Sequence, residues 1–475
     1  MSAMTAASAR AKRISIRARA ISLAAVRPST IANMTSGLKR TLGTTDLTLL
    51  VVGSVIGSGI FLVPSTVLRQ SGGSVAVATS VWLVGGVLSL LGALAYAELG
   101  AMDRGSGGLY SYIRDGFGTF PAFLYGWTLF FVIGSGTIAT LAVAAANYMG
   151  QFGTISPVMN KVIAVSLIII MMVINVRGTR GSASTLNVAT GIKVVAILAM
   201  SVLLFTLGGG AEAAPAPAPA GESVMTGATI SGVGLSIIAV LWAYEGWQYV
   251  TFAAGEATEP QRSLPLAIGF GTFALICIYL IANFAYLAAL GPARVAASER
   301  VAAEAMAAVL GKGAGAALAL AIIISMYSAA HSVVITAPRV YYSMARDGVF
   351  FKALGDVHPR FGTPAVAIVT SCVWAAVLAL SGTFEQLLTY VVFVGWIFYA
   401  LGAAAVIALR IKRPDAERPF RVPGYPLTPI LFVLAAAAIV VNTIVSQPGQ
   451  SAIGIGMVLL GAPAYLVWRR RSHPG

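Results

Sequence analysis

Charged residues and cysteine are both scarce in this sequence. Asp, Glu, Lys and Arg together make up 10% of its 475 residues, whereas a soluble domain carries roughly a quarter. The two cysteines, Cys277 and Cys372, both lie inside apolar runs, so neither can staple an extracellular loop. No metal-ligand spacing, phosphate-binding loop or nucleophile elbow is present. We therefore expect no metal, no cofactor and no enzymatic activity.

Apolar sequence fills most of the chain. Hydrophobic residues account for 58% of it, and the mean hydropathy is +0.86. Apolar stretches of about 20 residues follow one another, and each is long enough for a helix to cross a bilayer. The sequence therefore predicts an all-α membrane protein with twelve transmembrane helices. The expected spans are 47–69, 75–100, 118–149, 158–177, 184–207, 230–255, 264–290, 313–345, 363–383, 385–410, 426–446 and 451–468.

The net charge of +15 lies almost entirely outside these spans. Such a charge invites a nucleic-acid partner, but here it sits in short loops and in the N-terminal tail, which is the pattern that orients a membrane protein. With both termini inside, 25 of the 31 Lys and Arg residues lie on the cytoplasmic side and five lie outside. We expect a multi-pass protein of the inner (plasma) membrane with cytoplasmic termini and no nucleic-acid partner.

Residues 1–40 form a segment of their own, with eight basic residues and no acidic one. The apolar stretch between these charges is too short for the core of a signal peptide. We interpret the segment as a basic cytoplasmic tail that touches anionic membrane lipid. The alternative is that translation starts at Met34, which would remove most of the tail.

The first expected span contains a cluster of helix-weakening residues. Three glycines and two serines fall within 53–59, and each glycine weakens a helix by about 1 kcal/mol. A break at membrane depth must line a cavity or face protein. It exposes N–H groups that bind a carboxylate and carbonyl groups that suit an ammonium. The alternative is a close-packing face, because Gly53 and Gly57 have the spacing of small residues at helix contacts.

The sixth expected span holds the second such signal, in Leu241–Trp247. Glu245 is expensive at membrane depth and is expected to face a cavity, and Gly246 permits another break. The alternative is an aromatic packing cluster in which Glu245 bonds to a neighbouring helix. Since the two interrupted spans are five apart, they indicate an inverted-repeat transporter with its binding site between them.

Lys193 is the third signal, because it lies two to three turns inside the span 184–207. Its side chain is long enough to snorkel to the cytoplasmic interface. Two functional alternatives are a fixed positive charge beside the binding site, where another transporter would hold sodium, and a titrating group that couples protons.

Several of these motifs resemble a known family. Leu42–Phe61 resembles helix 1 of the amino acid–polyamine–organocation superfamily. Leu241–Trp247 with Pro260–Ile268 is similar to helix 6 and the following loop of L-type amino acid transporters and bacterial serine/threonine exchangers. Pro338–Gly348 is similar to their connection between helices 8 and 9. The resemblance covers about residues 40–470.

The resemblance implies a leucine-transporter-like fold that works by alternating access. Its core would span residues 41–412 and contain a 5+5 inverted repeat, 41–207 and 230–412, with helices 1 and 6 broken. Residues 413–475 would add helices 11 and 12 and the cytoplasmic C-terminus.

The resemblance also implies a substrate pose. Amides of Ser58, Gly59 and Ile60 would hold the carboxylate of an L-amino acid, and carbonyls of the two breaks would hold its amino group. Trp242 would close the site as an aromatic gate, and Lys193 would fill the sodium position of sodium-dependent relatives. The expected site residues are Val55, Gly57, Ser58, Gly59, Ile60, Trp242, Ala243, Glu245 and Gly246, with Lys193 as the coupling or structural cation.

We therefore expect a secondary active amino acid transporter, either a sodium-independent exchanger or a proton-coupled symporter. A polyamine or cationic amino acid carrier is the alternative, with Glu245, where many L-type transporters have Gly or Asp, meeting the substrate cation. A channel or sensor would need a filter or a soluble domain, and the sequence shows neither. Eukaryotic L-type relatives bind a heavy chain through a cysteine between helices 3 and 4. Residues 150–161 contain none, so we expect no disulfide-linked heavy chain.

Overall fold

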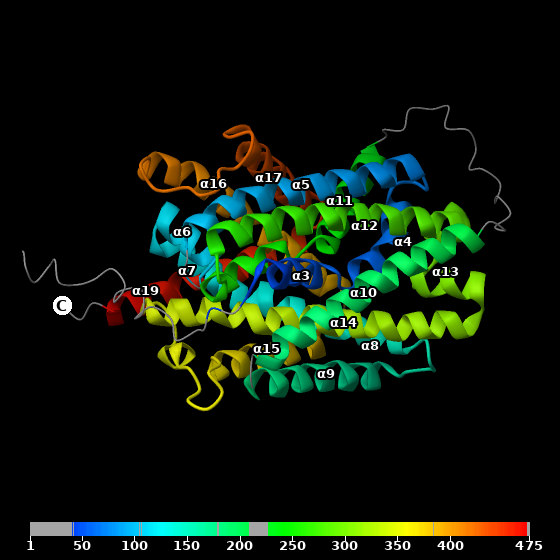
Figure 1. The fold of residues 1–475 in the computed structure, drawn as a ribbon, viewed down its shortest axis with the longest axis horizontal. Helices are drawn as coiled ribbons and strands as arrows, with labels where there is room; N and C mark the ends of the chain where they lie inside the picture. The colour runs from blue at the N-terminus through cyan, green and yellow to red at the C-terminus, as the bar shows by residue number, and fades with distance from the viewer. Residues whose placement is uncertain are drawn as a thin grey trace, which may run out of the picture. The chain divides into compact units, whose positions relative to one another are not determined.

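The computed structural model describes residues 40, 42–103, 105, 107–177, 180–208, 227–382 and 384–472. Within these residues the regular secondary structure is helical, apart from one isolated bridge between Leu42 and Ala257 (Figure 1). The basic tail over 1–39 lies outside the described residues, so its predicted role stays a prediction.

Twenty helical elements follow one another along the described chain. They are α3 (Thr44–Val55), α4 (Gly59–Gln70), α5 (Val75–Met102), α6 (Leu109–Phe117), α7 (Thr119–Thr128), η1 (Leu129–Gly134), α8 (Ser135–Met149), α9 (Pro157–Arg177), α10 (Arg180–Leu207), α11 (Gly227–Ala243), η2 (Trp247–Glu256), α12 (Pro260–Ala297), α13 (Val301–Leu310), α14 (Lys312–Arg346), η3 (Lys352–Gly355), α15 (Ala365–Ser381), α16 (Phe384–Lys412), α17 (Leu427–Ser446), α18 (Pro448–Leu459) and α19 (Gly461–Ser472).

The protein is a multi-pass membrane protein, and its helices agree with most of the expected spans. In the described residues, nine helices are long and apolar enough to cross a membrane, or up to ten when the bent pair α3 and α4 is counted as one span. The broken first span is confirmed, with a bend of 45°. The expected spans 230–255 and 363–383 correspond to α11 and α15, which have 17 residues each and fall short of that length. The count of twelve spans thus remains a prediction.

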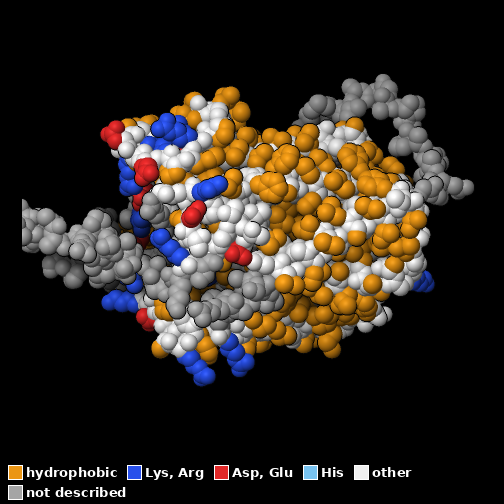
Figure 2. All heavy atoms as spheres, in the orientation of Figure 1, with side chains coloured by type: hydrophobic (Ala, Val, Ile, Leu, Met, Phe, Trp, Pro, Cys, Tyr) orange, Lys and Arg blue, Asp and Glu red, His pale blue; other side chains and the backbone are white. Residues whose placement is uncertain are grey.

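The outer surface has the chemistry that a bilayer requires. On the face shown in Figure 2, hydrophobic side chains cover most of the helices, and charged side chains gather toward the end where α6 and α19 lie in Figure 1. On α12 the exposed apolar side chains include Leu266, Phe270 and Phe273, which share one face of the helix. Because burial inside the protein does not explain these apolar positions, contact with lipid does.

The helices pack as two groups. In one, α12 packs on α3, α4 and α5, and α11 packs on α4 and α5. In the other, α14 packs on α8, and α15 packs on α8 and α9. Helix α10 contacts α3 and α12 of the first group and α14 of the second, and α16 contacts α5 and α8. The breaks at the end of α3 and at the end of α11 therefore lie in the same group.

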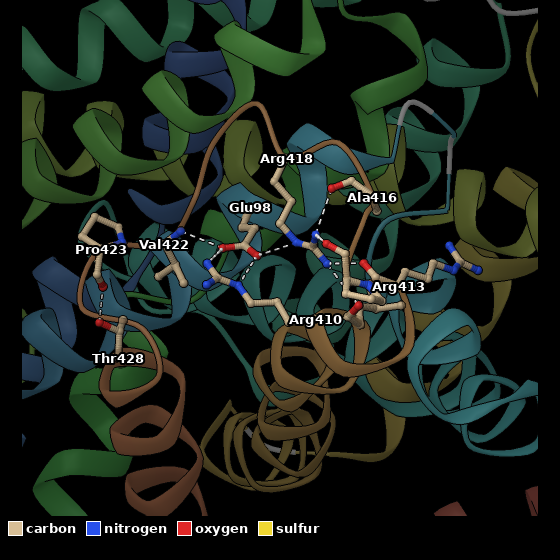
Figure 3. Close-up of polar contacts among 10 residues, drawn as sticks. Glu98, Arg410, Arg413, Ala416, Arg418, Val422, Pro423 and Thr428 are labelled. Atoms are coloured by element: carbon tan, nitrogen blue, oxygen red, sulfur yellow. Dashed lines mark hydrogen bonds and ion pairs between the residues drawn. The ribbon is translucent and has the colours of Figure 1, made fainter.

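A buried ion cluster fixes the end of α5 to α16 and to the segment before α17 (Figure 3). Glu98 is 1% exposed and accepts two hydrogen bonds from Arg410, at 2.9 and 2.7 Å. The backbone N–H of Val422 donates to the same carboxylate at 2.7 Å, and Arg418 Nε lies 3.6 Å from it. Arg410 also lies over the ring of Tyr425, 3.8 Å from its centre. One carboxylate therefore organises the turn between two helices.

Candidate substrate site

The first break leaves polar backbone groups at membrane depth. Helix α3 ends at Val55, residues 56–58 are not helical, and α4 begins at Gly59. The carbonyl of Ser58 accepts from the amides of Phe61 and Leu62, as at the start of a helix. Within the described chain, the amides of Ser58 and Ile60 donate no backbone hydrogen bond. These free donors are what a carboxylate needs.

The second break faces the first. Helix α11 ends at Ala243, and the chain turns through 244–246 before η2 begins. Gly246 has a φ of 127°, in the region that favours glycine. A Cβ atom on this residue would lie 2.9 Å from the carbonyl carbon of Ser54, so its backbone rests directly on α3. Glycine is needed here for both reasons.

Close packing accompanies the breaks. A Cβ on Gly59 would lie 2.4 Å from Cα of Ala243, so α4 and α11 touch backbone to backbone there. A Cβ on Gly53 would lie 2.3 Å from Oγ1 of Thr190 on α10. The small residues of the first span therefore serve packing as well as the break, so the close-packing alternative posed by the sequence is present together with the break.

A small cavity lies between the two breaks, and we call it the break cavity. Its volume is about 20 Å³, enough for about one water molecule. Trp242 lies across it and donates from Nε1 to Oγ of Ser58 at 3.1 Å. An amino acid needs more room than this, so the site is closed in the described conformation. The break cavity is lined by Ser54, Val55, Gly57, Ser58, Gly59, Thr137, Leu141, Trp242, Glu245 and Tyr249.

Six of the nine predicted substrate-binding residues line this cavity. The other three lie next to it: Ile60 follows Gly59 in the first turn of α4, Ala243 touches Gly59, and Gly246 rests on Ser54. The predicted set omitted four residues that line the cavity: Ser54 of α3, Thr137 and Leu141 of α8, and Tyr249 of η2. Ser54 lies inside the first predicted motif and Tyr249 lies two residues after the second, so both could have been found from sequence. Nothing in the sequence of α8 marked Thr137 and Leu141.

Glu245 is buried in the turn of the second break and is 7% exposed. Its Oε1 accepts hydrogen bonds from Nε2 of Gln248, at 2.5 Å, and from the hydroxyl of Tyr399 on α16. Gln248 also donates to the hydroxyl of Tyr399 at 2.9 Å, and its side-chain Oε1 accepts from the backbone N–H of Gly246 at 3.2 Å. The aromatic-cluster alternative is therefore partly right, because Glu245 does bond to a neighbouring helix, yet it also lines the cavity.

Lys193 of α10 binds the backbone of the first break. It is 4% exposed, and its ammonium donates to the carbonyls of Gly53, at 2.8 Å, and Ile56, at 2.9 Å. Ser325 of α14 also donates to Ile56, at 3.2 Å. The lysine is held inside the protein by the end of α3, so the alternative in which it snorkels to the interface is wrong.

One predicted contact group is already occupied. The carbonyl of Val55, expected to hold the substrate amino group, accepts from the hydroxyl of Tyr279 at 3.1 Å. The carbonyl of Glu245 accepts no backbone hydrogen bond within the described residues. The second break therefore offers the freer acceptor in this closed conformation. No group of three or more His, Cys, Asp or Glu side chains suited to a metal occurs in the described part of the chain.

Comparison with known proteins agrees with the motifs. The sequence matches the amino acid permease family over residues 42–467, which include both breaks. It is 30% identical to the serine/threonine exchanger SteT of Bacillus subtilis (strain 168) over 444 residues, 92% of this chain and 98% of the exchanger.

Two human proteins show the same degree of similarity. The large neutral amino acids transporter small subunit 2 is 30% identical over 435 residues, 90% of this chain and 80% of its own length. The cystine/glutamate transporter is 30% identical over 433 residues, 89% and 85% of the two chains. The resemblance inferred from the motifs is thus confirmed across almost all of the sequence.

Proposed function

Because the chain belongs to the amino acid permease family, a family of transporters and not of enzymes, we propose that it is a sodium-independent secondary active transporter for an L-amino acid. The observation that carries the proposal is the break cavity, into which two interrupted helices of one group direct polar backbone. Uptake of radiolabelled amino acids into proteoliposomes, with a panel of unlabelled competitors, tests it. The absence of saturable uptake of any amino acid would refute it.

The proposed pose uses the two breaks for the two charges of the substrate. The carboxylate binds the free amides at the start of α4, around Ser58 and Ile60. The ammonium binds carbonyls of the second break, with that of Glu245 available. Trp242 must swing away for the substrate to enter, because its bond to Ser58 closes the cavity now. Esterified and N-acetylated forms of the transported amino acid should therefore compete poorly in the uptake assay.

The proposed fold is a 5+5 inverted repeat over 41–207 and 230–412, with twelve spans and with α17 to α19 added in 413–475. It is supported by the position of the breaks, since each lies in the first helix of its repeat. Cytoplasmic termini are supported by the charged side chains gathered at the end that contains α6 (Figure 2). Reporter fusions after Gly475 would contradict this orientation if they were active only outside the cell.

Lys193 supplies the proposed independence from sodium. Its ammonium donates to two carbonyls of the first break, and it thus takes the place that a bound sodium ion would otherwise fill. Uptake should be unchanged when sodium is replaced by choline. Lys193→Ala should lose transport and stability, because a buried carbonyl left unpaired costs about 1–3 kcal/mol. A variant that keeps both would refute the structural role of the cation.

The relatives' names set the substrate panel. The relatives are named for serine and threonine, for large neutral amino acids, and for cystine and glutamate. The panel should therefore include all three kinds of amino acid. A cationic amino acid or polyamine is the second candidate, favoured by one observation, the carboxylate of Glu245 in the cavity. Competition by arginine or spermidine but not by neutral amino acids would select it.

We propose that transport requires no disulfide-linked partner. Both cysteines lie within helices of the transporter, Cys277 in α12 and Cys372 in α15. A larger species on a non-reducing gel that disappears with a Cys277→Ser/Cys372→Ser variant would contradict this proposal.

A further inference from the structure

Glu245 differs from the buried Glu98 and the partly buried Glu256 in having no basic partner among the described residues. Glu98 is paired with Arg410 and Arg418, and Glu256 with Arg339. Within the part of the chain that the structure describes, no ion pair joins Glu245 to a lysine, arginine or histidine. An ionised carboxylate without a compensating charge is expensive to bury at membrane depth.

The hydrogen bonds of Glu245 are confined to one oxygen. Gln248 and Tyr399 both donate to Oε1, and no described residue bonds to Oε2. Since Glu245 lines the break cavity and its Oε1 already accepts two hydrogen bonds, Oε2 is the oxygen left to bind a proton, water or substrate when the cavity opens. The two donors therefore act as positioning residues that hold the carboxylate with its other oxygen unpartnered.

The surroundings of Glu245 contain phenols rather than cations. Tyr96 of α5, Tyr125 of α7, Tyr249 of η2 and Tyr399 of α16 are the titratable side chains around it, and all are buried. The cation of the first break, Lys193, is bound to the carbonyls of Gly53 and Ile56 instead. Among the described residues, no ion pair thus holds Glu245 ionised.

We propose that Glu245 is the binding site of a proton that crosses the membrane together with the substrate. The proposal rests on the proposed function and adds its coupling ion. When the cavity is open and hydrated on the outer side, the Glu245 carboxylate takes up one proton and becomes a neutral carboxylic acid. The cavity then closes without burying an unpaired charge. It opens to the cytoplasm, where the acid releases the proton to water and becomes a carboxylate again.

This mechanism links closing of the cavity to protonation through the energy of burial. The closed cavity has room for about one water molecule, so an ionised Glu245 would lose nearly all of its hydration on closing. The neutral acid loses far less. Closing around substrate is therefore favoured when the proton is bound, and leakage of the empty ionised carrier is opposed.

A fluorescence titration tests proton binding without any substrate. Trp242 and Trp247 lie on either side of the turn that holds Glu245, so protonation should alter the tryptophan emission of the purified protein. We expect a pH-dependent transition in the wild type that Glu245→Gln removes. Glu417→Gln makes the same chemical change at an exposed position and should keep the transition. A transition that persists in Glu245→Gln would overturn the proposal.

Transport supplies the second readout. For one proton per substrate, an inward gradient of about one pH unit can drive about ten-fold accumulation. We expect wild type and Glu417→Gln to approach this ratio in proteoliposomes, and Glu245→Gln to show a ratio near one, whatever its basal rate. If Glu245→Gln does not transport, the fluorescence titration decides. Wild-type uptake that is saturable but insensitive to the gradient would refute proton coupling while leaving the proposed transporter intact.

Lys193 is the competing proton carrier, and the fluorescence titration, which needs no transport, separates the two. If Lys193→Ala removes the fluorescence transition and Glu245→Gln does not, the proton binds the lysine, and the proposal is wrong. A transition lost in Glu245→Gln and kept in Lys193→Ala supports it.

Discussion

Replacing Glu98 by glutamine tests whether the ion cluster at the end of α5 stabilises the protein. The change keeps the shape of the side chain but removes its charge and turns one acceptor oxygen into a donor group. Each carboxylate oxygen faces donors, since Arg410 binds both and Val422 binds Oε2. Either orientation of the new amide therefore places its NH2 group against a donor.

The magnitude follows from the burial of the partners. Breaking a buried ion pair by removing one partner costs about 3–5 kcal/mol. The side chain of Arg418 is 5% exposed, whereas that of Arg410 is 20% exposed and can recover some hydration. Arg418 also keeps its hydrogen bonds to backbone carbonyls, such as that of Arg413 at 2.7 Å. We therefore expect a loss at the lower end of the range, about 3 kcal/mol.

Unfolding of the purified protein in mixed micelles, by increasing fractions of sodium dodecyl sulfate, measures this loss. Glu417→Gln is the matched control, because Glu417 lies in the same turn, is exposed and has no ion pair among the described residues. It should change the free energy of unfolding by no more than about 0.5 kcal/mol. A Glu98→Gln variant as stable as this control would show that the cluster contributes nothing to stability.

Two substitutions in the first break separate binding from packing. Gly57→Ala should lower substrate affinity at least about ten-fold, because Gly57 lines the break cavity and the new methyl takes up part of it. It should destabilise the protein by less than about 1 kcal/mol, because the nearest neighbour of the methyl is the movable end of Leu141, at 3.0 Å. Equal affinity in a competition assay would contradict the proposed site. Gly53→Ala should destabilise the protein by about 1–3 kcal/mol, since its methyl would lie 2.3 Å from Oγ1 of Thr190. Adding Thr190→Ala removes that atom and should restore most of the thermal stability, and a double variant no better than the single one would refute the packing argument.

The breaks themselves could be predicted from the sequence because their causes are local. Gly57 and Ser58 weaken the helix where they stand, and Gly246 adopts a backbone angle that other residues avoid. The helical segments were also predictable, since a run of about 20 apolar residues reads directly as helix at membrane depth. These parts of the fold depend on few residues that are close in sequence.

The partners of the key side chains could not be predicted. Tyr399 lies 154 residues after Glu245, and the apolar pattern of α16 is nearly uniform around the helix, so it gives no direction for the tyrosine. Lys193 shows the same limit. The sequence showed how deep Lys193 lies in its span. It did not show whether the side chain points to the interface or to α3, because that depends on how α10 is rotated about its axis. Rotation is set by tertiary contacts that periodicity does not record.

The structure also changes how the glycines of the first break are to be understood. From sequence, a packing face and a binding site were competing explanations for them. At Gly59 the proposed binding site depends on the close packing, because the missing side chain lets the backbone of α4 approach Ala243. That approach is what brings the free amides at the start of α4 opposite the turn that carries Glu245. A larger residue at position 59 would separate the two breaks and destroy the site and the packing together. Substitutions at Gly57, where the nearest neighbour can move, are therefore the ones that report on substrate binding alone.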